Sequence, residues 1–147
     1  MAYTRAKRIT GGGREAITRL QAVAAAIWDL KNGSSGWQWV TFDSEGSKNP
    51  IEIARESDLS DSVIVNIPHR ERDGLLSGFD EVGLELPPGW VVTKDKKKGI
   101  LFGGFLHLSV APEYQDALSD FVEEAGLKLF GWDQSLSITC SLQKGCP

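Results

Sequence analysis

The sequence is poor in the residues that most often carry chemistry, with only two cysteines, two histidines and one methionine among 147 residues. Cys140 and Cys146 are too few for a disulfide framework, and their spacing, with no histidine nearby, fits no common zinc site. The sequence also lacks a Gly-x-Ser-x-Gly nucleophile motif and a Walker or Rossmann phosphate loop. We therefore expect reduced thiols, no cofactor and no metal. These absences favour a protein that is not an enzyme.

Long hydrophobic runs are also absent. No apolar stretch approaches the roughly 20 residues of a membrane-spanning helix, and no N-terminal segment resembles a signal peptide. Hydrophobic residues nevertheless make up 41% of the chain, and five tryptophans and six phenylalanines argue against disorder. We expect a single cytoplasmic domain with a real hydrophobic core and no membrane partner.

Three consecutive glycines, Gly11 to Gly13, run into a helical pattern close to the start of the chain. Nothing strand-like precedes them and no Lys-Ser or Lys-Thr pair follows, so a phosphate-binding loop is disfavoured. We interpret residues 1–13 as a flexible basic leader, residues 14–142 as one domain and residues 143–147 as a tail.

Apolar periodicity predicts the elements of that domain. We expect a helix over residues 14–31, whose apolar stripe includes Trp28, and then strands over 37–42, 51–54 and 63–67. A hairpin over 90–102, a strand over 105–110, a helix from Pro112 to Gly126 or Gly131 and a strand over 136–140 follow. A short helix over 70–77 is also predicted. The order indicates an α+β fold: a mainly antiparallel sheet of about five to six strands, with the N-terminal and C-terminal helices packed on it.

The net charge of −4 is unevenly distributed along the chain. Residues 1–31 hold six Lys/Arg against two Asp/Glu, whereas residues 32–93 hold four against eleven. The basic residues that could contact an anion fall in the leader and in the hairpin: Arg5, Lys7, Arg8, Lys96, Lys97 and Lys98. With a pI of about 5.2 and no recognition motif, nucleic-acid binding is the third choice.

Aromatic and acidic residues point instead to a protein partner. If Trp37 and Trp39 share one face of the sheet, that face is more apolar than one core requires, and such patches mark interaction surfaces. The alternative, that tryptophans are core residues, stays open. Acidic side chains would suit a basic partner, and we take four as candidates: Asp58, Asp61, Glu123 and Glu124.

His69 and His107 support the second choice, a small enzyme or ligand-binding domain. They lie on different predicted elements, and neither has a partner at ligand spacing. A pocket that both histidines face would favour this alternative.

The segment from Gly78 to Trp132 contains a "GLELPPGW" turn into a tryptophan, strands and an amphipathic helix ending in "FGW". This layout, with a helix and a meander before it, resembles the TY-Chap family of bacterial proteins, whose fold is like that of type III secretion chaperones. The resemblance implies a non-catalytic, dimerising domain that holds a protein partner. We therefore expect a protein-binding domain that acts as a chaperone, adaptor or immunity-type inhibitor.

Overall fold

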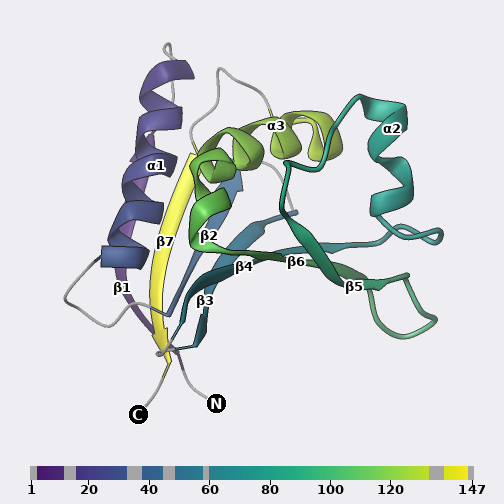
Figure 1. Cartoon of the computed structure of the whole chain (residues 1–147), viewed down its shortest axis with the longest axis horizontal. Coiled ribbons are helices and arrows are strands. Elements are labelled where there is room, and N and C mark those ends of the chain that lie inside the picture. The colour runs from purple at the N-terminus through teal and green to yellow at the C-terminus, as the bar shows by residue number, and fades with distance from the viewer. Residues whose placement is uncertain are drawn as a thin grey trace.

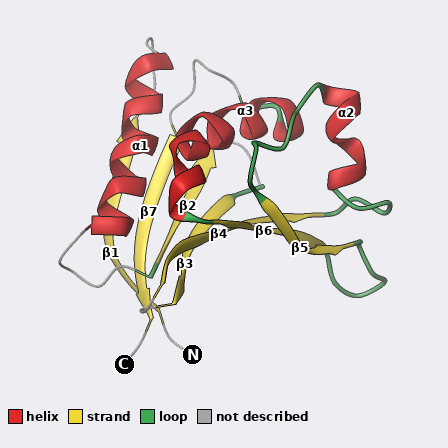
Figure 2. Cartoon of the chain, in the orientation of Figure 1, coloured by secondary structure: helices red, strands yellow, loops and turns green. Residues whose placement is uncertain are grey.

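The computed structural model describes residues 3–11, 16–32, 38–44, 49–57, 60–132 and 138–145. The α+β fold is confirmed: the described strands form one sheet in the order β1-β7-β2-β3-β4-β6-β5, and every pair of neighbours is antiparallel. The strands are β1 (Tyr3–Gly11), β2 (Trp39–Ser44), β3 (Ile51–Ser57), β4 (Ser60–His69), β5 (Val91–Lys96), β6 (Gly104–Val110) and β7 (Ile138–Gly145). Figures 1 and 2 show the sheet curving beneath the helices.

The centre of the sheet is the expected meander of β2, β3 and β4. Along these strands and β6, alternate residues are buried, and the register aligns them in rows across the sheet. One such row runs through Val40, Ile53, Val65 and Leu108, all of which are fully buried. The buried side chains, which are every second residue of each strand, therefore form one continuous apolar face.

The N-terminal and C-terminal helices cover this apolar face. Helix α1 spans Ala16–Asn32, and helix α3 spans Leu118–Phe130 after a 3-10 turn over Pro112–Ala117. Figure 1 shows both helices on the same side of the sheet. Helix α3 ends at Gly131, which has a left-handed φ of 64°, whereas Gly126 stays inside the helix against the Trp132 ring.

The edge strand β1 corrects the expectation of a flexible leader over residues 1–13. Its backbone pairs with β7 along the register from Tyr3↔Gly145 to Gly11↔Ile138, and the sheet has seven strands as a result. β7 likewise reaches into the segment expected to be a tail. A basic, polar sequence is typical of a leader, but it is equally suited to an edge strand, which needs no second apolar face.

The segment between β4 and β5 also differs from expectation. The helix predicted over residues 70–77 is replaced by a 3-10 turn over Leu76–Gly78 and the short helix α2 over Phe79–Val82. Burial explains the shift, because Phe79 is in the core and packs against Phe121 of α3 at a centroid distance of 6.5 Å. Among the described residues, no helix is long and apolar enough to span a membrane.

None of the described helices packs on the other face of the sheet (Figure 1). Half-buried polar side chains form a row across its centre, because Thr41 pairs with Glu52, Glu52 with Asn66 and Asn66 with His107. The Asn66 amide donates to Glu52 Oε1 at 3.5 Å. We call this surface the open face.

Candidate functional site

The most exposed apolar group of the described chain lies at the end of the β5–β6 hairpin. Ile100, Leu101 and Phe102 are 102%, 84% and 73% exposed, and we call these three residues the apolar tip. The strand predicted over 100–102 is wrong, because these residues form bends and β6 begins only at Gly104. Strand-forming side chains do not make a strand where the pairing ends, and here the last pair is Lys96↔Phe105.

Backbone hydrogen bonds hold the apolar tip in place. The Gly99 N–H donates to the Phe102 carbonyl at 2.9 Å, and the Lys98 N–H donates to the Glu71 carbonyl at 3.0 Å. At the base of the hairpin, a Cβ on Gly104 would clash with the Lys96 carbonyl and the His69 ring, so only glycine fits there. The tip is thus presented by an ordered loop.

Exposed lysines precede the apolar tip along the hairpin, with Asp95 among them. Lys94, Lys96 and Lys97 are exposed, and the Lys96 ammonium lies 5.7 Å from the centre of the Phe105 ring. An apolar centre with a charged rim is the usual composition of a binding surface. The sequence predicted the lysines as candidate anion contacts but missed the apolar residues beside them. The sequence does contain a sign of this exposure. Ile100, Leu101 and Phe102 form an unbroken apolar run between glycines, without the alternation of apolar and polar residues that marks a half-buried strand.

The other candidate anion contacts lie away from this hairpin. Arg5, Lys7 and Arg8 belong to β1, at the opposite edge of the sheet from β5, and only their backbone is described. A single nucleic-acid surface formed by both groups therefore gains no support from the fold.

The two histidines lie on opposite faces of the sheet. His69 is on the helix-covered face, is 4% exposed, and its Nδ1 accepts a hydrogen bond from the Glu71 N–H at 3.0 Å. His107 is half-buried on the open face, with its ring centre 4.6 Å from that of Phe105. Burial lowers the pKa of both, opposed at His69 by Asp95 and Glu71 and reinforced at His107 by Lys94.

A hollow of about 410 Å³ beside β4 and β6 is lined by both histidine residues. Since His69 and His107 extend from opposite faces of the sheet, the two rings do not face each other across this hollow. Within the described residues, no three histidine, cysteine, aspartate or glutamate side chains gather as metal ligands would.

The candidate acidic residues that the structure describes lie in different surroundings. The Glu124 carboxylate on α3 forms an ion pair with the Lys128 ammonium at 2.6 Å, and that ammonium also donates a hydrogen bond to the Gly83 carbonyl. Asp61, at the start of β4, lines a pocket that also contains Lys31 and Arg55. Glu123 is half-buried, and Asp58 lies outside the described residues.

The tryptophans divide between core and surface. Trp90 and Trp132 are core residues, and Trp39 is half-buried on the open face, while Trp37 lies outside the described residues. Trp28, predicted to lie in the apolar stripe of the first helix, is instead 62% exposed. Helix α1 meets the sheet through Val23, Ala26 and Leu30, which turns Trp28 outward.

Comparison with models of protein families, with curated proteins and with solved structures finds no match to this chain.

Proposed function

We propose that this chain is a non-catalytic protein-binding domain whose apolar tip inserts into an apolar pocket of a partner protein. The observation that carries the proposal is the exposure of three consecutive large apolar side chains on a loop whose backbone is hydrogen-bonded in place. Exposing such side chains has a cost in water, and they become favourable once a partner buries them. A preorganised loop also loses little conformational entropy on binding.

The lysines indicate the chemistry of the partner. Lys94, Lys96 and Lys97 lie on the same hairpin as the tip, so acidic groups around the partner's pocket would complement them. The basic partner expected from the sequence stays a prediction, and one of the acids on which it rests, Glu124, is paired with Lys128. The roles of chaperone, adaptor or immunity-type inhibitor, and dimerisation, are all compatible with this surface. A TY-Chap-like role would be as well.

A protein suits this tip better than a bilayer does. A small apolar anchor gives only marginal membrane binding by itself. The lysines of the hairpin would attract an anionic bilayer. Asp95 lies among them, however, and the chain as a whole carries a net charge of −4.

The decisive experiment compares three forms of the full chain as bait in lysate of the native cells. The tip variant carries Ile100→Ser, Leu101→Ser and Phe102→Ser, and the matched control carries Val91→Ser, which alters an exposed apolar residue of the same hairpin. We expect one stoichiometric protein to bind wild type and control but not the tip variant. With that protein purified, the tip variant should bind roughly 30-fold or more weakly by calorimetry, as expected when a hot spot is lost.

Charge provides an independent check on the same complex. Replacing Lys96, Lys97 and Lys98 with glutamine should lower affinity and flatten its dependence on salt. A partner that binds wild type and tip variant equally would contradict the proposal. So would binding to anionic vesicles, lost in the tip variant, with no protein retained from the lysate.

A further inference from the structure

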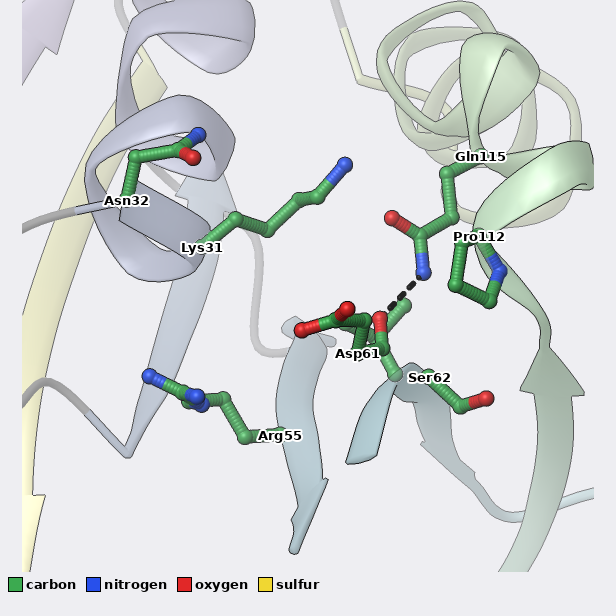
Figure 3. Close-up of a pocket in the computed structure, with 8 residues that line it drawn as sticks. Lys31, Asn32, Arg55, Asp61, Ser62, Pro112 and Gln115 are labelled. Carbon is green, nitrogen blue, oxygen red and sulfur yellow. Dashed lines mark hydrogen bonds between the residues drawn. The ribbon is translucent and has the colours of Figure 1, made fainter. Parts of the chain in front are cut away.

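A second pocket lies away from the hairpin, where the last turn of α1, the start of β4 and the 3-10 turn over Pro112–Ala117 meet (Figure 3). Its volume is about 250 Å³, and polar side chains dominate its lining: Lys31, Asn32, Arg55, Asp61 and Gln115. This size suits a small ligand or the end of a chain. The apolar tip contributes nothing to it.

Gln115 is the most informative residue of this pocket. Its Nε2 donates to the carbonyls of Asp61 at 2.7 Å and Val110 at 3.1 Å. Because both carbonyls can only accept, the amide orientation is fixed and the oxygen must point the other way. Figure 3 shows that oxygen turned into the space beside Lys31.

The Gln115 oxygen has no hydrogen-bond partner, although the residue is only 6% exposed. Buried acceptors are nearly always satisfied, since an unsatisfied one costs roughly 1–3 kcal/mol. A ligand that supplies an N–H donor at this point would remove that cost.

The charged groups around the oxygen are of both signs. Figure 3 shows the Lys31 ammonium and the Asp61 carboxylate on either side of the gap, with the Arg55 guanidinium beyond them. Among the residues that the structure describes, these three groups form no ion pair with one another. The Lys31 ammonium beside the Gln115 oxygen can hold a carboxylate, while Asp61 and Gln115 can accept from a nitrogen.

An apolar groove continues from the pocket between α1 and α3. It has a volume of about 150 Å³, shares Lys31, Asn32 and Gln115 with the pocket, and is lined by Ile27, Trp28 and Leu118. The exposed face of Trp28 would be covered by an apolar side chain lying there. Pocket and groove together therefore offer a polar end and an apolar end to one ligand.

We propose that this pocket and groove bind an α-carboxylate that has an adjacent N–H donor and an apolar side chain. Lys31 holds the carboxylate, the Gln115 oxygen accepts from the N–H, and the groove beside Trp28 takes the side chain. A free apolar amino acid and the C-terminal residue of a peptide share this chemistry. The site is independent of the proposed protein-binding surface.

The test is a titration of the ¹⁵N-labelled full chain, followed by NMR, with L-leucine, N-acetyl-L-leucine and L-leucinamide. We expect saturable shifts at Lys31, Ser62 and the Gln115 side-chain amide with at least one of the two carboxylates. L-leucinamide, which lacks the carboxylate, should bind roughly tenfold or more weakly. Binding of N-acetyl-L-leucine identifies a peptide terminus as the source, and binding of L-leucine alone identifies a free amino acid.

Variants separate the site from a fortuitous contact. Lys31→Gln should weaken binding roughly 10-fold or more, and Trp28→Ala should weaken it too, whereas Lys94→Gln at the far edge of the sheet should not. The tip variant should bind as wild type does, so failure of one proposal leaves the other intact. The inference is overturned if neither carboxylate shifts these resonances at concentrations on the order of 10 mM. It is equally overturned if L-leucinamide binds as well as L-leucine, or if Lys31→Gln changes nothing.

Discussion

At the scale of single residues, burial changes the protonation and reactivity of ionisable side chains. Glu52 sits in the middle of the open face, where its carboxyl accepts a hydrogen bond from Asn66 at 3.5 Å. Burial raises the pKa of this carboxyl above its ordinary value of 4.5, although the Asn66 hydrogen bond opposes the shift. The native state therefore keeps this proton to higher pH than the unfolded state does.

Because the unfolded state loses this proton first, Glu52 lowers the free energy of unfolding as pH rises from about 4.5 through the pKa of Glu52 in the native state. Glu52→Gln, which keeps an acceptor for Asn66, should raise the urea midpoint at pH 7, and the gain should shrink towards pH 4. Urea unfolding at several pH values measures this. Glu56→Gln, at an exposed acid of the same strand, is the control. A gain that stays constant with pH would contradict the assignment.

Cys140 is the other residue whose surroundings decide its behaviour. It is fully buried, and burial raises the pKa of its thiol to about 12, with Glu123 adding to the shift. Since the thiolate is the reactive form, a nucleophilic role is disfavoured. In a Cys146→Ala background we expect the thiol to react with a disulfide reagent at pH 8 roughly 100-fold more slowly than free cysteine, and rapidly in urea. Fast reaction in the folded state would show that Cys140 is accessible.

At the scale of elements, the β5–β6 hairpin depends on close backbone approach at one glycine. Gly104→Ala places a methyl group against the Lys96 carbonyl and the His69 ring, and should cost roughly 1–3 kcal/mol of unfolding free energy. Hydrogen exchange should show that the amides of β5 lose protection first. Gly78→Ala is the matched control, because a Cβ there meets nothing within 4 Å and its φ is −88°. Equal effects of the two changes would mean that the hairpin does not need this contact.

At the scale of the whole molecule, β1 forms one edge of the sheet and contacts α1. Deleting residues 1–11 should lower the unfolding free energy by roughly 3 kcal/mol or more, because β7 loses its outer partner. If residues 1–11 were a flexible leader, deleting them would not change the urea midpoint. The urea midpoint therefore distinguishes a paired strand from a leader. Deleting Cys146 and Pro147, beyond the end of β7, should leave it unchanged.

The elements that were predictable have a strong period in sequence. Helix α3 and the meander of β2, β3 and β4 were recognised because their apolar residues recur at helical or strand spacing. Neither surface proposed to bind a ligand was recognised, because each depends on exposure. Whether Ile100 or Trp28 is buried depends on what packs over it, and neighbours along the chain do not reveal this.

Local patterns of apolar and polar residues thus determined the fold class, the order of most elements and the composition of the core. Only the tertiary structure decided that residues 3–11 form a strand, that the histidines face opposite ways, and that Lys31, Arg55 and Gln115 meet at one pocket. The physical reason is the range of the interactions. Secondary structure follows from periodicity within a few residues, whereas strand pairing and pockets depend on contacts between segments distant in sequence.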